Sequence, residues 1–219
     1  MKNNRATIVG TFASKCEYSH TGTKYGERFF RTELMTPRTS GVIDTVPVLL
    51  PERLLNLDEE MKWETVKVTG EFRSRNADVD GKRRLLLYVF ADSLEAMEPI
   101  DCDWENHLEL RGFLCKEPVY RETPRGRQIT DLLLAVNRTG GRSDYIPCIA
   151  WERDARDASK LAIGTSVALV GRIQSRDYTK RMEDGTVKER TAYEVSISKM
   201  ETGWKEDFVP AEERTEINE

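Results

Sequence analysis

The sequence has few of the residues on which most enzymes and metal sites depend. Its 219 residues include two histidines and four cysteines, and no two cysteines form a C-x-x-C pair. A structural zinc site needs closely spaced Cys and His ligands, and general acid–base catalysis uses His most often. The sequence has no run near the roughly 18 apolar residues of a membrane span, and it contains no phosphate-loop or G-x-S-x-G motif. We therefore predict a protein that is not an enzyme and uses no metal and no cofactor.

The amino terminus and the cysteines indicate the compartment. Residues 1–12 pass from a short polar stretch into apolar residues without the core and cleavage site of a signal peptide. Disulfides are rare in the cytosol, so we expect Cys16, Cys102, Cys115 and Cys148 to be free thiols. The protein is predicted to be cytoplasmic.

The chain repeats itself at an offset of about 100 residues. Four segments of the first half match four of the second in the same order: 4–12 with 106–114, 38–47 with 138–147, 52–53 with 152–153, and 66–75 with 167–176. Four ordered matches indicate a tandem duplication. We predict one domain at 1–100, a second at 104–201 and an acidic tail at 202–219.

Each repeat is predicted to be a small β-barrel. In the second unit, five runs show the alternation or apolar content of strands: 107–115, 129–137, 144–151, 166–176 and 191–199. Residues 152–162 alone have helical spacing. This inventory is typical of the OB-fold, a five-stranded Greek-key barrel, whereas an immunoglobulin-type sandwich needs about seven strands. The predicted fold class is all-β with one short helix per unit, forming two tandem OB-fold barrels followed by a disordered tail.

Charge is distributed unevenly along the chain. The net charge is −4, but residues 104–200 carry +3, residues 1–103 carry −2 and residues 201–219 carry −5. A basic nucleic-acid binder is usually positive as a whole. Because the acid is concentrated in the tail, the total does not exclude an anionic ligand for the second unit.

Aromatic and basic side chains share the predicted outward faces of two strands in the second unit, since side chains alternate along a strand. The set comprises Tyr145, Trp151, Arg172, Gln174, Arg176 and Tyr178, followed by the loop cations Lys180 and Arg181. Unpaired bases stack on Tyr or Trp with about 1–3 kcal/mol per base, while Arg neutralises phosphates. The pattern favours single-stranded nucleic acid. In the alternative interpretation, the aromatic rings fill a subunit interface or cap the barrel, and the arginines pair with carboxylates.

Several motifs of the second unit resemble the bacterial single-stranded DNA-binding protein family. They are LAVNR at 134–138, DYIPCIAW at 144–151, GRIQSRDY at 171–178 and AYEV at 192–195. The resemblance covers about 106–200. It implies sequence-tolerant binding of single-stranded DNA in replication, recombination and repair, at the nucleoid. It also implies roles for individual residues: base stacking for Tyr145, Trp151 and Tyr178, and backbone contacts for Arg111, Arg172 and Arg176.

The first unit departs from the second at these positions. Thr45 and Pro51 stand where the second unit has Tyr145 and Trp151, and residues 76–78 contain no aromatic to match Tyr178. Its strand at 66–75 still offers Arg73 and Arg75 for phosphate contacts. We expect a degenerate barrel that mainly supports assembly. An aromatic that the family often has after its second strand is also missing, at 137–142.

The resemblance also implies partners. Family members typically form assemblies of four OB-folds, which implies a homodimer of this two-barrel chain. They end in an acidic tip closed by a hydrophobic residue that recruits replication and repair proteins. The tail here ends at Glu219 without such a residue, which favours a solvated end over recruitment. The alternative function is an OB-fold scaffold, a primosome-like assembly factor with weak or no DNA binding. No membrane partner is expected.

Overall fold

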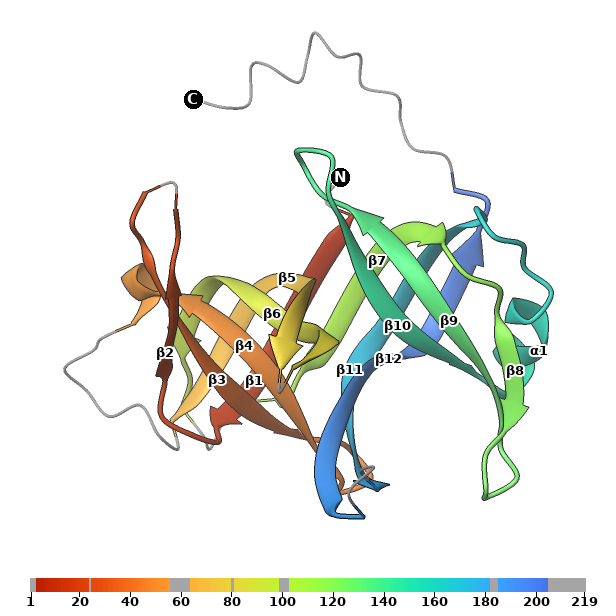
Figure 1. The fold of residues 1–219 in the computed structure, drawn as a ribbon, viewed down its shortest axis with the longest axis horizontal. Helices are drawn as coiled ribbons and strands as arrows, with labels where there is room; N and C mark the ends of the chain where they lie inside the picture. Colours follow the sequence, from red (N-terminus) through yellow and green to blue (C-terminus); the bar gives the residue numbers. More distant parts are fainter. Residues whose placement is uncertain are drawn as a thin grey trace, which may run out of the picture.

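Two sets of six strands, one from each repeat, make up most of the computed structural model, which describes residues 3–23, 25–55, 64–79, 81–98, 103–181 and 185–204. Figure 1 shows the two sets as neighbouring barrels. The first contains β1 (Asn4–Phe12), β2 (Glu17–Thr21), β3 (Arg28–Pro37), β4 (Ile43–Pro51), β5 (Thr65–Val79) and β6 (Lys82–Ala96). The second contains β7 (Asn106–Leu114), β8 (Val119–Glu122), β9 (Gln128–Asn137), β10 (Ser143–Trp151), β11 (Ser166–Arg181) and β12 (Val187–Thr202).

Each set closes into a five-stranded ring. In the first, β1 pairs with β3 and β5, β3 pairs with β4, β4 runs parallel to β6, and β6 pairs with β5. The strands β7, β9, β10, β12 and β11 close in the same way. This is the Greek-key closure of the OB-fold, so the predicted fold class is confirmed. The short strands β2 and β8 were not expected; each extends its barrel at the edge of β3 or β9.

The helical segments are shorter than the sequence indicated. The helix α1 covers Glu152–Ala158 and not 152–162. Beyond it the chain turns back, and the N–H of Gly164 donates to the carbonyl of Leu114 at 2.8 Å, so that β11 can begin at Ser166. In the first unit the described residues contain a 3₁₀ turn at Glu52–Leu54, and 56–63 lie outside them. No helix in the described ranges is long and apolar enough to cross a membrane.

Alternate residues of the strands build the barrel cores, and β5 and β11 each carry a glycine where the strand register shifts. Gly70 and Gly171, equivalent in the repeat, both follow a shift in strand register. A Cβ on Gly70 would lie 2.1 Å from the carbonyl oxygen of Phe90, and one on Gly171 would lie 2.5 Å from that of Ser196. Only glycine allows two backbones this close, which explains why both repeats carry it here.

The barrels are joined by an antiparallel pairing of β1 with β7. Ala6 pairs with Leu108 at the centre, Asn4 pairs with Leu110, and Ile8 pairs with Asn106. Because β1 and β7 are equivalent at an offset of 102, this register is the same when viewed from either barrel. It gives the chain an internal approximate twofold axis and one continuous sheet of twelve strands.

A buried carboxylate from the second barrel crosses this junction. Asp144 is fully buried and forms an ion pair with Arg138 of its own barrel. Its Oδ1 also accepts the backbone N–H of Ser74 on β5 of the first barrel. In return, the hydroxyl of Ser74 accepts the N–H of Tyr145 at 2.7 Å. The carboxylate is therefore held from both sides of the junction.

The first barrel repeats this arrangement in the opposite direction. Asp44 is fully buried, pairs with Arg38, and accepts the N–H of Ser175 on β11 at 3.0 Å. The hydroxyl of Ser175 accepts the N–H of Thr45 at 2.9 Å. A buried charge is tolerated when it is paired and hydrogen-bonded, and each barrel supplies half of what the other's carboxylate needs.

We predict that Asp144→Asn lowers the free energy of unfolding by about 3–5 kcal/mol, since it leaves Arg138 without its buried counter-charge. The control is Asp131→Asn, which breaks an exposed ion pair with Arg121 and is expected to cost less than about 1 kcal/mol. Urea unfolding followed by circular dichroism measures both. Equal losses for the two variants would contradict a structural role for the junction carboxylate.

Candidate functional site

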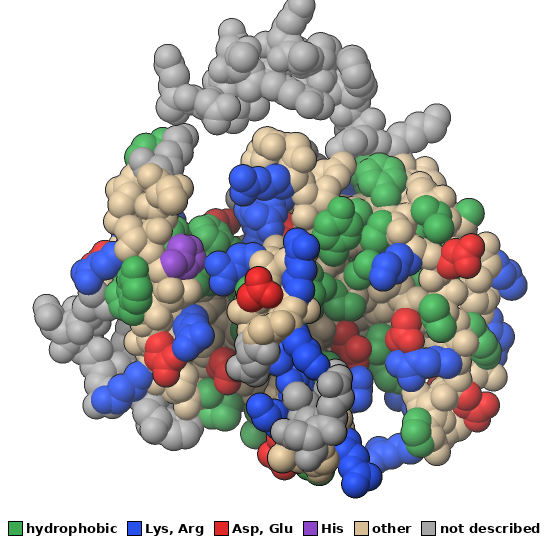
Figure 2. Space-filling view, viewed as in Figure 1, with side chains coloured by type: hydrophobic (Ala, Val, Ile, Leu, Met, Phe, Trp, Pro, Cys, Tyr) green, Lys and Arg blue, Asp and Glu red, His purple; other side chains and the backbone are tan. Residues whose placement is uncertain are grey.

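A groove of about 1240 Å³ lies between the barrels, and its walls carry mainly positive charge. Among the described residues that line it, eight are Lys or Arg and two are Glu. Strands β5 and β6 of the first barrel provide five of the cations, at Arg73, Arg75 and 82–84. Figure 2 shows Lys and Arg side chains gathered along the middle of this face, where the barrels meet.

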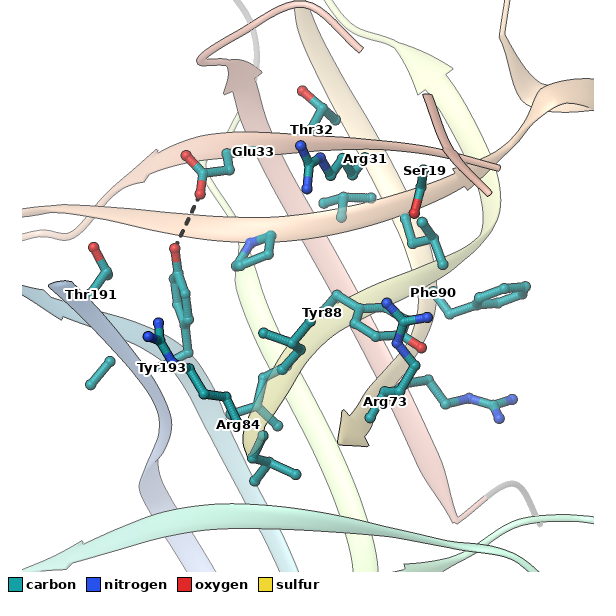
Figure 3. Close-up of a pocket in the computed structure, with 18 of the residues that line it drawn as sticks. Ser19, Arg31, Thr32, Glu33, Arg73, Arg84, Tyr88, Phe90, Thr191 and Tyr193 are labelled. Atoms are coloured by element: carbon teal, nitrogen blue, oxygen red, sulfur yellow. Dashed lines mark hydrogen bonds between the residues drawn. The ribbon is translucent and has the colours of Figure 1, made fainter. Parts of the chain in front are cut away.

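Aromatic rings from both barrels also line the groove. Tyr88 and Phe90 come from β6 of the first barrel, and Tyr193 comes from β12 of the second (Figure 3). Tyr178 of β11 lines the groove as well. The hydroxyl of Tyr193 donates to a carboxylate oxygen of Glu33 on β3 at 3.1 Å, which ties the β11–β12 hairpin to the first barrel. Burial, and then the charge of Glu33 and this hydrogen bond, raise the pKa of Tyr193 well above its ordinary value. The groove is therefore a shared surface and not a property of one barrel.

Two of the predicted stacking residues are open to solvent. The exposed fraction is 44% for Tyr145 and 37% for Tyr178. Tyr178 lies on the groove wall, and the guanidinium of Arg176 is 5.8 Å from the centre of its ring. Tyr145 follows Asp144 at the barrel junction. Both rings have accessible surface that a ligand could use.

The third predicted stacking residue, Trp151, is covered on one face of its ring. Its indole N–H donates to the hydroxyl of Ser196 at 3.0 Å, which fixes the ring orientation. The guanidinium of Arg127 lies 4.4 Å from the ring centre and pairs with Glu152 at 3.2 Å. Glu152 has a φ of 50°, a rare conformation for a residue other than glycine. A cation therefore occupies the position that a stacked base would take.

The sequence analysis did not single out Arg127. A partial signal was available in the first barrel, where Arg28 bonds Glu52 through two nitrogens. Glu52 corresponds to Glu152, while Arg28 corresponds to Gln128, the residue after Arg127. In the first barrel Pro51 takes the place of Trp151. Both repeats thus pair an arginine with the glutamate that follows β4 or β10, but from positions one residue apart, and the ring of Trp151 lies beneath the arginine of the second repeat.

Gln174 lies beneath the surface, and Arg172 is half-buried. The amide of Gln174 accepts from Arg172 at 3.3 Å and donates to Glu194 at 2.7 Å. Burial, and then the nearby Arg38, lower the pKa of Arg172 from its ordinary value. Gln174 thus faces protein groups in this structure, and its predicted contact with a ligand stays a prediction.

The remaining predicted cations are dispersed. Arg75 and Arg181 are exposed, and the side chain of Lys180 lies outside the described residues. Arg73 forms an ion pair with Glu71 on the groove wall. Arg111 lines a separate pocket of about 180 Å³. The structure therefore brings Arg73, Arg75 and Tyr178 to one groove and places Arg111 elsewhere.

The sequence analysis missed Tyr88 and Phe90 because it did not sort the residues of the strand that became β6 into two faces. In β6, Leu87, Val89 and Ala91 are buried in the core. Tyr88 and Phe90 alternate with them and so lie on the opposite face. This alternation is visible in the sequence. Within the described ranges, no three His, Cys, Asp or Glu side chains form a group that could hold a metal ion.

The second unit matches a known family. The profile of the single-strand binding protein family matches residues 105–202. The single-stranded DNA-binding protein 2 of Listeria innocua and the single-stranded DNA-binding protein A of Bacillus subtilis are each 40% identical over 80 residues. These alignments cover 33% of this chain and 50% and 46% of the relatives. The chain thus spans about half the length of the curated relatives that it matches.

Crystal structures of the single-stranded DNA binding protein from Thermus aquaticus resemble the whole chain. A deletion mutant aligns with a TM-score of 0.70 and 25% identity, covering 95% of this chain and 97% of that one. The wild-type protein aligns with a TM-score of 0.73 and 23% identity, covering 96% and 98%. Both barrels, and not the second alone, are therefore part of the shared fold.

Proposed function

We propose that the protein binds single-stranded DNA with little sequence preference, because its second barrel matches the single-strand binding protein family over residues 105–202. It would coat and protect exposed strands in replication, recombination and repair, acting at the nucleoid in the cytoplasm. The proposal involves binding alone and no chemical step.

The groove between the barrels is the observation that carries this proposal. It combines eight cations with aromatic rings from both barrels. Cations track a phosphate backbone, and rings stack on bases of any identity because every base has a π-face. A groove of this composition suits a flexible anionic strand with exposed bases, and it provides no reason for a preferred sequence.

The second barrel supplies the main stacking residues in this proposal. Tyr145 and Tyr178 have exposed ring surface. Trp151 becomes available when an incoming base displaces Arg127 from its ring, after which the guanidinium can turn to a phosphate. Arg176, beside Tyr178, is placed to contact the backbone next to a stacked base.

Cations of both barrels hold the backbone in this proposal. Arg73 and Arg75 reach the strand from the first barrel, and the half-buried Arg172 contacts it from the second, while the hairpin cations Lys180 and Arg181 close over it. Contact with Arg111 requires the strand to continue past the groove, because this side chain lines a different pocket.

Assembly completes the proposal. The first barrel supports the second through the β1–β7 pairing, and two chains form a homodimer with four OB-folds. Recruitment of replication and repair proteins by the tail stays a prediction, because 205–219 lie outside the described residues.

The first prediction from this proposal concerns stacking. We expect the double variant Trp151→Ala, Tyr178→Ala to bind labelled oligo-dT at least about tenfold more weakly, since each lost stack is worth about 1–3 kcal/mol. Fluorescence anisotropy at low salt measures the affinity, with circular dichroism as a check on folding. Tyr120→Ala, on the edge strand β8, is the control. Unchanged DNA binding together with loss of a protein complex would support the scaffold alternative instead.

The second prediction concerns the cation over Trp151. Arg127→Ala is expected to tighten binding of short oligo-dT by roughly two- to fivefold, because a base no longer has to break a cation–π contact of about 0.5–1 kcal/mol. Arg28→Ala is the control, since it removes an Arg–Glu pair of the first barrel that does not cover a tryptophan ring, and it should leave affinity unchanged. A loss of affinity specific to Arg127→Ala would mean that this arginine holds the strand and does not compete with it.

The third prediction concerns the oligomer. Light scattering after size-exclusion chromatography should give twice the chain mass of 25.2 kDa, because two chains complete four OB-folds. A monomer mass across micromolar concentrations would contradict the proposed homodimer and leave the DNA-binding proposal intact.

A further inference from the structure

We propose that the hydrogen bond between Tyr193 and Glu33 is a releasable latch. It holds the β11–β12 hairpin against the first barrel in the free protein, and it breaks when a single strand of nucleic acid enters the groove. The inference rests on the proposed function. It adds two positioning residues, which act on the shape of the groove and do not themselves hold the strand.

The outer part of this hairpin, residues 175–181 and 187–193, is an arm that extends beyond its own barrel. In the described ranges, β11 pairs with β7 as far as Gly171, and β12 pairs with β10 at Val195 and Ser196. Beyond these residues, the two strands of the arm pair with each other. Figure 1 shows the arm reaching from the second barrel toward the first. Its position therefore depends on contacts with the first barrel.

Hydrogen bonds at two levels join the arm to the first barrel. At its base, Ser175 bonds Asp44 and Thr45 across the junction. Tyr193 pairs with Ser175 in the ladder, and its hydroxyl donates to Glu33 on β3 at 3.1 Å. Asp44 is fully buried, whereas Tyr193 and Glu33 are half-buried and line the groove. A ligand in the groove can therefore compete with the second contact and not with the first.

The equivalent positions in the other half of the repeat are apolar. The register of β5 with β6 places Leu87 where the second barrel has Tyr193. The register of β9 with β10 places Leu133 where the first barrel has Glu33. Two leucines cannot form a bond that responds to charge in the groove. The charge-sensitive link thus belongs to the β11–β12 arm and not to its counterpart.

The bond crosses the groove from one wall to the other. Figure 3 shows it between the ribbons of β3 and β12, with Arg84 and Tyr88 of β6 to one side. A strand that runs from Tyr178 of the arm to the cations of the first barrel has to cross this line. Its phosphates also bring negative charge toward Glu33, and like charges repel at short range. Entry of the strand therefore costs the free energy of this hydrogen bond.

Removing the hydroxyl of Tyr193 tests the latch. Tyr193→Phe keeps the ring that packs against the barrel core. This variant should bind labelled oligo-dT about three- to tenfold more tightly, because the strand no longer has to break a hydrogen bond. Fluorescence anisotropy at low salt measures the affinity. Tyr120→Phe removes an exposed hydroxyl on β8 and is the control that should leave affinity unchanged. Unchanged or weaker binding by Tyr193→Phe would overturn the latch.

A double-mutant cycle tests whether the hydroxyl acts through Glu33. In a Glu33→Ala background the acceptor is gone, so Tyr193→Phe should change the affinity by less than about twofold. Glu17→Ala removes the other glutamate among the described groove residues and keeps the latch, so in that background Tyr193→Phe should keep its full gain. An equal gain in both backgrounds would mean that the hydroxyl acts through another group, which contradicts the inference.

Nuclear magnetic resonance tests the release in the unaltered protein. With an isotope label at the ring carbon that bears the tyrosine hydroxyl, the Tyr193 signal is identified by its loss in Tyr193→Phe. Saturating oligo-dT should move this signal to the position that it has in Glu33→Ala. A Tyr193 signal that stays in place at saturation would refute the release and leave the proposed function intact. A wild type that binds no oligomer at low salt would refute the proposed function and the release together.

Discussion

Two buried carboxylates determine how the barrels meet. Asp44 and Asp144 each pair with an arginine of their own barrel and accept a backbone N–H from the other. Separating the barrels would take from each carboxylate the backbone N–H that it accepts across the junction, and a change of orientation that kept it buried would leave a charge without its full set of hydrogen bonds. The relative orientation of the barrels is therefore set by electrostatics as well as by the β1–β7 pairing. The groove exists because this orientation is fixed, since its walls come from both barrels.

The repeat has kept the residues of the junction and changed those of the groove. Asp44 and Asp144, Ser74 and Ser175, and Gly70 and Gly171 are the same residue type in both halves. These positions meet backbone or bury charge, and few side chains satisfy such conditions. The residue types that line the groove are less constrained, because many arrangements of aromatic rings and cations suit a flexible nucleic-acid strand. Trp151 bonds to Ser196 in the second barrel, whereas the first barrel has Pro51 and Phe90 at the corresponding positions of the same framework.

Sequence reasoning could recover the fold, because it is encoded in local patterns. The alternation of Val167, Leu169 and Ile173, and the repeat of the glycine between them, indicate the strands and their duplication. The site was recovered in part. Of the predicted site residues, Tyr178, Arg73 and Arg75 line the groove and Arg111 does not. The cation over Trp151 comes from Arg127, 24 residues earlier in the sequence. The role of Asp44 and Asp144 at the junction was out of reach, since the backbone N–H groups that they accept lie on the other barrel. Tyr88 and Phe90 were within reach, and comparing the halves position by position obscured them because the ring had changed strands.

The internal twofold axis has a consequence for direction. Two identical barrels related by such an axis would present a groove whose two ends are indistinguishable, and a strand could lie in it either way with equal energy. Here the junction keeps the symmetry and the walls do not, because one wall bears its rings on β6 and the other bears them on the β11–β12 hairpin. The two ends of the groove are chemically different. A polynucleotide has unlike 5′ and 3′ ends, so its two directions in this groove make different contacts.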